Sequence, residues 1–262
     1  MTIVELPVET WYDALFLRRS QRKYSGEIPD EKISSRIEKV CTDFRPFTDS
    51  RAVLVKEPAN DVFKGAIGPY FFKVTDAPYY IAFIADMKAS NAQSITGYLG
   101  EGIILEATSL GLNTCWVGGF FRRDSVMKQV TLQRNERVLA VTPVGYSNKR
   151  ADRVGAVPIN YRRKNLNKLV IGKNSNKNKW IKSALDAARI APSATNRQPW
   201  RFQISDDAIT VTSDSSHEGF GVSRKLDCGI AMLHLELGAR YAGVTGSWEF
   251  LKFPHVAKYR IN

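Results

Sequence analysis

Two polar segments near opposite ends of the chain carry residue types that could bind an anionic ligand. Residues 18–24 read Arg-Arg-Ser-Gln-Arg-Lys-Tyr. Arginine keeps its charge and presents a planar fork of donors that matches phosphate oxygens. Residues 191–200 read Ala-Pro-Ser-Ala-Thr-Asn-Arg-Gln-Pro-Trp, in which a proline fixes the turn and serine and asparagine offer short hydrogen-bonding groups. Each segment supplies part of what a phosphorylated, polar ligand needs.

Each segment on its own also has a purely structural interpretation. A basic string such as residues 18–22 suits the C-terminal end of a helix, where the helix dipole favours cations. Residues 191–200 could be a proline-rich turn from a helix into a strand. The two segments become informative because they occur together in one chain.

Together the two segments resemble the flavin-binding signatures of the FMN-dependent nitroreductase family, RRSxR and PSxxN. In that family both motifs lie close together in one subunit, and two subunits build each flavin pocket between them. Here most of the chain separates the motifs. The resemblance therefore implies the α+β nitroreductase fold, with two pseudo-symmetric halves in one chain that mimic the family homodimer. It is closest to the internally duplicated subgroup.

The resemblance implies which residues contact FMN. Arg18 and Ser20 correspond to phosphate and ribityl contacts, with Arg19 completing the motif. Arg22 corresponds to a group at the pyrimidine edge of the ring, where a cation favours the reduced anion. The corresponding residues of the second motif are Pro192, Ser193, Ala194 and Asn196.

Two further places complete the implied pocket. Gly118 and Gly119 match a glycine loop whose backbone N–H groups face flavin N5 and O4, since glycine permits close approach to the ring. Arg163 and Lys164 resemble a basic cluster that completes the phosphate site. Residues 198–200 match the family as well and are expected to end the loop and start a strand.

The resemblance also implies an activity. FMN carries the hydride chemistry, so we expect no catalytic side chain of the protein. NAD(P)H is the expected reductant and delivers hydride to flavin N5. The expected second substrate is a small electron-poor acceptor such as a nitroaromatic, a quinone or an activated alkene. Aromatic side chains that could line the acceptor face are Phe71, Phe72, Phe120 and Phe121.

We expect one FMN per chain. Residues 42–47 read Thr-Asp-Phe-Arg-Pro-Phe where the first half should carry a PSxxN loop, and the second half has no RRSxR motif. A faint internal repeat agrees with two halves: the helices expected at 97–110 and 226–241 align at an offset of 127, which pairs Gly111 with Gly238.

Two other functions stay open. The chain could be a flavin-binding or flavin-processing protein without nitroreductase turnover, because fold does not determine reaction. It could also be a cofactor-free basic interaction protein, since its net charge is +12. Between Lys149 and Lys182, eleven Lys or Arg stand against a single acid, Asp152. A solvated connector and a positive field for phosphorylated ligands both explain this segment. Nucleic-acid binding is not expected, since no helix-turn-helix, zinc-finger or RRM motif accompanies it.

The composition indicates a globular protein of one large or two small domains, with 262 residues, 44% hydrophobic and 24% charged. No stretch approaches the roughly 18 consecutive apolar residues of a membrane span, and the first residues do not resemble a secretory signal. The three cysteines, Cys41, Cys115 and Cys228, are widely spaced, and an odd number argues against a disulfide framework. We expect a cytoplasmic monomer that acts as a pseudo-dimer, without a membrane partner.

The three histidines give no sign of a metal site. His217, His234 and His255 lack the spacing of metal ligands. His234 lies within an apolar helix and is expected to be a hydrogen-bonded core residue. Neither the dinucleotide-binding nor the P-loop glycine motif is present.

Periodicity and turn signals predict the elements that position the motifs. Helices are expected at 10–19, 29–41, 97–110, 179–190 and 226–241. Strands are expected at 52–55, 79–85, 114–117, 138–144, 202–204, 209–212 and 244–250. The composition turns rich in Lys, Arg and Asn after residue 146. We therefore expect one nitroreductase-like half at 1–160, a basic connector at 161–178 and a second half at 179–262.

Overall fold

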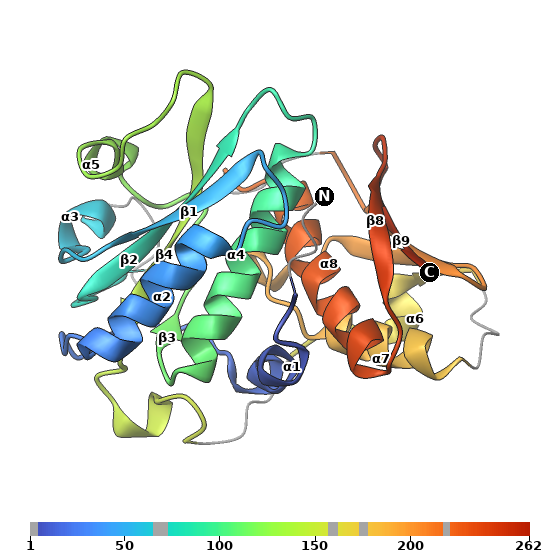
Figure 1. Ribbon diagram of the computed structural model, residues 1–262, viewed down its shortest axis with the longest axis horizontal. Coiled ribbons are helices and arrows are strands. Elements are labelled where there is room, and N and C mark those ends of the chain that lie inside the picture. Colours follow the sequence, from blue (N-terminus) through green and yellow to red (C-terminus); the bar gives the residue numbers. More distant parts are fainter. Residues whose placement is uncertain (1–4, 65–72, 157–161, 173–177, 217–220) are drawn as a thin grey trace.

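Two long helices occupy the centre of the molecule, between two β-sheets. The computed structural model describes residues 5–64, 73–156, 162–172, 178–216 and 221–262. Helices α4 (Ala92–Ser109) and α8 (Arg224–Tyr241) lie side by side, with one sheet beyond each of them (Figure 1). Within the described ranges, no helix combines the length and apolar character that crossing a membrane requires.

The first part of the chain builds a four-stranded sheet with the order β1-β2-β4-β3, in which all neighbours are antiparallel. Its strand β2 is an apolar run with six consecutive buried residues, as expected for the inside of a sheet. In chain order the elements are α1 (Val8–Leu17), α2 (Glu31–Asp43), β1 (Ser50–Val55), α3 (Asn60–Phe63), β2 (Tyr79–Asp86), α4, β3 (Asn113–Thr114), α5 (Arg123–Met127), β4 (Glu136–Gly145) and the short η2 (Arg150–Asp152).

The second part of the chain builds a five-stranded sheet with the order β5-β6-β7-β9-β8. Strand β5 pairs parallel with β6, and the other neighbours are antiparallel. The described part of the expected connector therefore adds a strand to this sheet. In chain order the elements are α6 (Leu166–Leu169), β5 (Val170–Ile171), α7 (Lys179–Arg189), η3 (Ala194–Asn196), β6 (Trp200–Ile204), β7 (Ala208–Ser213), α8, β8 (Gly246–Phe250) and β9 (His255–Ile261).

The two sheets share one topology. The order β1-β2-β4-β3 is repeated by β6-β7-β9-β8, and in both sets a long helix follows the second strand. The pairing of β2 with β4 shifts after Phe83, which lies opposite Ala140. The pairing of β7 with β9 shifts after Val211, which lies opposite Ala257. Such irregularities sit at specific positions of a sheet, so their match indicates equivalent strands.

The central helices are equivalent at an offset of 132 residues. Both contain 18 residues, and both their first and their last residues differ by 132 positions. The glycines that follow them, Gly111 and Gly243, have φ values of +81° and +82°. The offset of 127 predicted from the sequence is therefore wrong. Both helices are buried on most sides, so their apolar residues are not confined to one face. The sequence therefore offers no periodic marker for aligning the residues of one helix with those of the other.

Reciprocal glycine contacts bring the two helices together. A Cβ on Gly97 would lie 2.1 Å from the carbonyl oxygen of Leu226, and a Cβ on Gly229 would lie 2.0 Å from the carbonyl oxygen of Ser94. Both glycines thus allow a backbone approach that no side chain would permit. Each contact residue of α4 lies 132 positions before its counterpart in α8. The two helices therefore contact each other through corresponding residues.

The α+β class and most predicted elements are confirmed, with bounds that shift by no more than two residues. Helix α4 begins earlier than predicted, at Ala92, after the N-cap residue Asn91, whose side chain makes no capping hydrogen bond. Strand β3 stops at Thr114, although Val117 forms an isolated bridge with Val141. Strand β9 was missed, although its apolar and basic residues alternate over residues 257–261, and it pairs with both β7 and β8.

Candidate functional site

A cavity lies between the two parts of the chain and takes its walls from both. Seven of the twelve residues implied by the family resemblance line it. The first part contributes Ser20, Arg22, Trp116, Val117, Gly118, Gly119 and Phe120, and the second part contributes Pro192, Ser193, Ala194, Thr195, Val222, Leu226, Asp227 and Ile230. Segments from opposite ends of the sequence thus meet at one site.

The first motif leaves α1 as an extended segment that crosses the edge of the first sheet. Ser20 bridges to Thr114 of β3, and the backbone N–H of Gln21 donates to the carbonyl oxygen of Thr114 at 2.8 Å. Farther along, Tyr24 is fully buried and forms a bridge with Ser147. These contacts fix the segment, and the side chains of Ser20 and Arg22 line the cavity.

The first two arginines of this motif lie elsewhere. Arg18 is 4% exposed, and its Nε lies 3.8 Å from Oε1 of the buried Glu101. Arg19 lies 3.6 Å from Asp152 through its Nη1. Neither residue lines the cavity as the structure describes it. The resemblance placed both on the cofactor, but their ion pairs point to neighbouring protein groups.

The glycine loop forms another part of the cavity wall. Val117 and Val141 exchange two backbone hydrogen bonds of 2.9 Å, which attach this loop to β4. A Cβ on Gly118 would lie 2.8 Å from Cγ2 of Val222, so a side chain at position 118 would collide with the second part of the chain. The loop therefore approaches Val222 closely because position 118 is a glycine.

The second motif adopts a backbone that is unusual for its residues. Thr195, Asn196 and Gln198 have φ values of +50°, +58° and +48°. The left-handed conformation costs about 1–2 kcal/mol for a residue with a Cβ, and such conformations persist only where surrounding groups enforce them. Ser193 provides one such group, since its Oγ accepts a 2.9 Å hydrogen bond from the Gln198 backbone.

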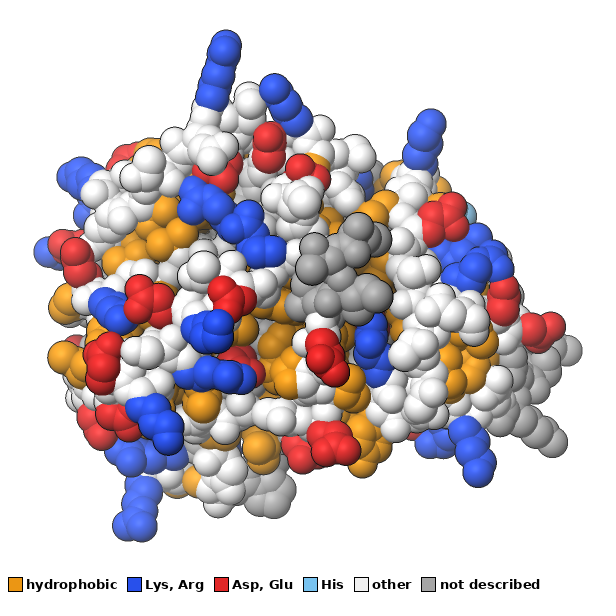
Figure 2. All heavy atoms as spheres, in the orientation of Figure 1, with side chains coloured by type: hydrophobic (Ala, Val, Ile, Leu, Met, Phe, Trp, Pro, Cys, Tyr) orange, Lys and Arg blue, Asp and Glu red, His pale blue; other side chains and the backbone are white. Residues whose placement is uncertain are grey.

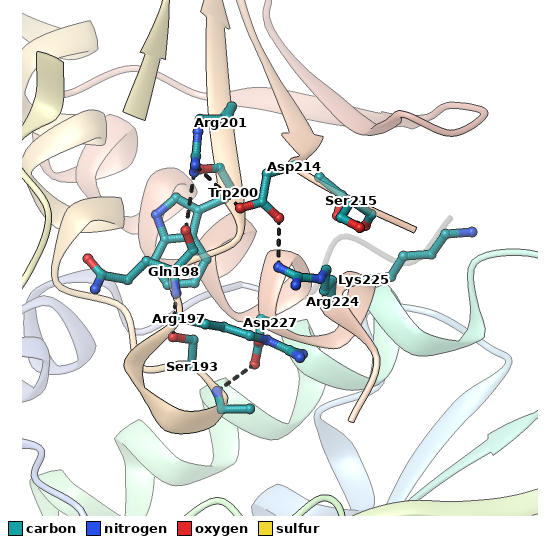
Figure 3. Close-up of polar contacts among 12 residues, drawn as sticks. Ser193, Arg197, Gln198, Trp200, Arg201, Asp214, Ser215, Arg224, Lys225 and Asp227 are labelled. Carbon is teal, nitrogen blue, oxygen red and sulfur yellow. Dashed lines mark hydrogen bonds and ion pairs between the residues drawn. The ribbon is translucent and has the colours of Figure 1, made fainter. Parts of the chain in front are cut away.

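Asp227 of α8 holds the same loop from the cavity side. Its Oδ1 accepts a 3.0 Å hydrogen bond from the Ala194 N–H, and its Oδ2 accepts a 2.6 Å hydrogen bond from Arg197 Nε. Arg197 also donates to the carbonyl oxygen of Val222 at 2.9 Å. In Figure 3, the side chain of Asp227 points from α8 toward this loop. The charge pair therefore ties the second motif to the helix that lines the cavity.

Arg163 and Lys164 also bind this loop. Arg163 Nη1 donates to Asn196 Oδ1 at 2.7 Å, and its Nε donates to the carbonyl oxygen of Ala191 at 3.1 Å. Lys164 Nζ donates to the carbonyl oxygen of Arg197 at 2.7 Å. As the structure describes it, the cavity is lined neither by these two basic residues nor by Asn196. They pack behind the loop and support its shape.

A family model described as "Putative TM nitroreductase" matches residues 10–239 of this sequence. The chain belongs to this nitroreductase family. A crystal structure of "a putative nitroreductase" from Thermotoga maritima resembles the full chain, with a TM-score of 0.67, 18% identity, and coverage of 100% of this chain and 99% of that one. The nitroreductase fold predicted from the sequence is thereby confirmed.

Two further relatives match about half of the chain. A Methanothermobacter thermautotrophicus protein named "Putative NADH dehydrogenase/NAD(P)H nitroreductase" is 28% identical over 154 residues, which cover 51% of this chain and 75% of that protein. A crystal structure of a nitroreductase with bound FMN from Desulfitobacterium hafniense covers 53% of this chain and 90% of that one, with 18% identity and a TM-score of 0.42. Family membership makes this chain an oxidoreductase of the nitroreductase type.

For a member of this family, the lining of the cavity fits an FMN ring in its chemistry. A flavin needs apolar surface for its flat faces and donors along its polar edge. Trp116 and Ile230 contribute apolar walls, and Arg22 and Ser193 contribute donors. Gly118 adds a stretch of wall without a side chain.

The sequence did not reveal the residues that α8 contributes. Leu226, Asp227 and Ile230 of α8 line the cavity, as does Val222 just before the helix, but the start of α8 resembles ordinary core. The available signal was an aspartate in an otherwise apolar stretch. Burial raises the pKa of Asp227 to about 6, although Arg197 and the Ala194 N–H act in the opposite direction.

Two basic residues, one next to the second motif and one at the start of α8, pair with the same acid. Arg201 Nη2 lies 3.3 Å from Asp214 and Arg224 Nη1 lies 2.8 Å from it, and both point toward that carboxylate in Figure 3. On the face shown in Figure 2, lysines and arginines are interspersed with acidic side chains. On that face, the excess of basic residues in the sequence does not form one continuous patch.

The expected aromatic wall is described in part. Phe120 lines the cavity, whereas Phe121 packs against the smaller core cluster of the first sheet. Phe71 and Phe72 lie outside the described residues, as does His217.

Proposed function

We propose that this protein is an FMN-dependent NAD(P)H oxidoreductase whose cofactor binds in the cavity described above. The observation that carries this proposal is the meeting of the two motifs. Ser20 and Arg22 come from the first, and Pro192, Ser193 and Ala194 come from the second. Neither motif alone could enclose a ligand, and the family to which the chain belongs makes a flavin the best candidate.

The cavity residues would bind and orient the cofactor. Arg22 supplies a fixed positive charge, which stabilises negative charge that develops in the cavity during reduction. The hydroxyl groups of Ser20 and Ser193 suit the polar edge and chain of the ligand. Gly118 and Gly119 allow the backbone to approach a flat ring.

Five residues implied by the resemblance lie outside the cavity lining. Contacts of Arg18, Arg19, Asn196, Arg163 and Lys164 with the cofactor therefore stay predictions. In the structure, the last three belong to the hydrogen-bond network around the second motif. Their contribution to binding would then come through the shape of that loop.

When bound, FMN supplies the redox chemistry: it accepts hydride from NAD(P)H and passes electrons to an electron-poor acceptor such as a nitroaromatic, a quinone or an activated alkene. The name of the Methanothermobacter relative supports NAD(P)H and nitro compounds as substrates here. The protein contributes apolar walls from Trp116, Phe120 and Leu226, which exclude water and strengthen the electrostatic effect of Arg22.

We further propose that the chain is an internal duplication, with halves at 1–160 and 179–262, and that it holds one FMN. The offset of 132 pairs Gly118 with Phe250. Phe250 packs edge-on against Phe47, with 5.3 Å between ring centroids, and Phe47 packs similarly against Tyr98 at 5.2 Å. Phe250 also lines a second hollow with Ser90, Ser94 and Lys252. Neither motif contributes to the described lining of that hollow, which supports a single site per chain.

The direct test is a titration of the purified protein with FMN. We expect one FMN per chain from the absorbance of the complex. Arg22→Ala should raise the Kd for FMN at least about tenfold, which corresponds to roughly 1.4 kcal/mol. Lys23→Ala is the matched control, since this neighbouring cation is exposed and lies outside the cavity lining.

The outcomes separate the possible functions. Bleaching of the bound flavin by NADH or NADPH under anaerobic conditions supports the oxidoreductase. Flavin that binds but stays oxidised with both nicotinamides indicates a flavin-binding protein without turnover. A wild-type protein that binds no FMN refutes the proposal, and two FMN per chain refutes the single site.

A further inference from the structure

Three buried glutamates on the two central helices each accept a hydrogen bond from a tryptophan N–H. Trp116 donates to Glu101, Trp11 donates to Glu106, and Trp248 donates to Glu236, each at 2.7 Å. Among these three tryptophans, Trp116 is the one that lines the cavity as the structure describes it. Glu101 therefore differs from the other two glutamates because the tryptophan that it binds lines the cavity.

Glu101 has no exposed surface and lies where the two halves meet. His234 of α8 places its Nε2 2.9 Å from Oε1 of this carboxylate, and Arg18 places its Nε 3.8 Å from the same oxygen. Trp116 donates to the other oxygen, Oε2. Arg18 and Trp116 come from the first half, and His234 comes from the second. One carboxylate thus connects the two halves directly behind the cavity wall.

The charges in this cluster are complementary. Nδ1 of His234 lies 3.1 Å from the carbonyl oxygen of Ala187, and Nε2 faces Glu101. Each ring nitrogen of His234 therefore has an oxygen within hydrogen-bonding distance. The predicted core role of His234 is confirmed. Burial raises the pKa of Glu101, but His234 and Arg18 lower it by more, so that its pKa lies below the usual value.

The ring of Trp116 has little freedom beside this carboxylate. It lies over α4 at Gly100, where a Cβ would be only 2.3 Å from Cη2 of the indole. On another side it packs against Phe83, with 4.8 Å between ring centroids. The hydrogen bond to Glu101 sets the remaining rotation of the ring. A change at Glu101 would therefore move a wall of the cavity.

We propose that Arg18, Glu101 and His234 form a positioning cluster that fixes Trp116 as a wall of the cofactor cavity. The inference rests on the proposed function of that cavity. It gives Arg18 a role that the motif resemblance did not suggest: it stabilises the ionised Glu101 from behind the wall. Removing a charge from such a buried cluster is costly because the remaining charges lose their partner.

Glu101→Gln tests this proposal, since glutamine keeps the size of the side chain and removes its charge. Glu106→Gln is the matched control. Glu106 lies on the same helix, is 3% exposed, and accepts from Trp11 at 2.7 Å and from Arg36 at 2.6 Å. Neither of these partners lines the described cavity. Both substitutions should lower the stability of the protein, and only the first should affect the cavity.

Two readouts distinguish positioning from general stability. In the protein without FMN, acrylamide quenching of Trp116 emission is obtained as the difference from the Trp116→Phe variant. We expect Glu101→Gln to raise this quenching at least twofold and the Kd for FMN at least tenfold. Glu106→Gln should leave both within twofold of wild type. Equal effects of the two substitutions on quenching and Kd would overturn the inference.

A second variant covers the case in which Glu101→Gln does not fold. Trp116→Phe keeps an aromatic wall and removes the N–H that Glu101 accepts, so it should also raise the Kd for FMN. An unchanged Kd in that variant would count against the positioning role. If the wild type binds no FMN but Glu101→Gln still loosens Trp116, the proposed function fails while the positioning cluster stands.

Discussion

Replacing Gly118 by alanine tests the close contact between the two halves at the cavity. The new Cβ would lie 2.8 Å from Cγ2 and 3.1 Å from Cγ1 of Val222, whereas ordinary contacts begin near 3.4 Å. The two segments must separate by several tenths of an ångström. Overpacking of this kind typically costs about 1–3 kcal/mol. If the cost falls on the cofactor-binding arrangement, the Kd for FMN rises about 5- to 150-fold.

A double-mutant cycle with Val222→Ala isolates this contact. The second substitution removes the two methyl groups that the new Cβ would meet, so the double variant should recover part of the loss. We expect an interaction free energy of about 1–2 kcal/mol, measured both by FMN titration and by urea unfolding. Effects of Gly118→Ala and Val222→Ala that simply add, within about 0.5 kcal/mol, would refute the geometry of this wall.

Three further predictions follow from contacts of Asp227, Asp30 and Gly229. The ionised Asp227 holds Arg197, and burial raises the pKa of Asp227 to about 6. The Kd for FMN should therefore rise as the pH falls through 6, and Asp227→Asn should remove this step from the pH profile of the Kd. Asp30 caps α2 through a 2.8 Å hydrogen bond from the Ile33 N–H, so Asp30→Ala should lower the free energy of unfolding in urea by about 1 kcal/mol without changing FMN affinity. Gly229→Ala should destabilise the protein by more than this cap, seen as a lower urea midpoint, because its Cβ would meet a backbone oxygen of α4 at 2.0 Å.

Local sequence signals predicted the elements well where they were strong. The hairpin of β6 and β7 and the amphipathic helix α7 follow from periodicity and from the proline that ends the helix. Strand β9 was missed although Ala257, Tyr259 and Ile261 alternate regularly with Lys258 and Arg260, because this signal covers only five residues. The repeat offset was also wrong, since backbone contacts at Gly97 and Gly229 determine the alignment and leave no periodic trace in the sequence.

The motifs predicted the meeting of the two ends but not every residue in it. Ser20, Arg22 and Ser193 line the cavity as expected. A motif cannot show that Arg18 faces Glu101, because that contact depends on how α1 meets α4. Asp227 was missed for the same reason, since its partners belong to a loop that is distant in the sequence.

The repeated topology within one chain has a consequence for how the two halves can change. In a symmetric dimer of identical subunits, any substitution enters both sites at once. In the duplication proposed above, each equivalent position is encoded separately, so position 118 is a glycine at the cavity wall while its counterpart is Phe250, which packs against Phe47. Likewise, Glu101 stands where the other half has Leu233. In such a duplication one half can change without the other, which identical subunits cannot do.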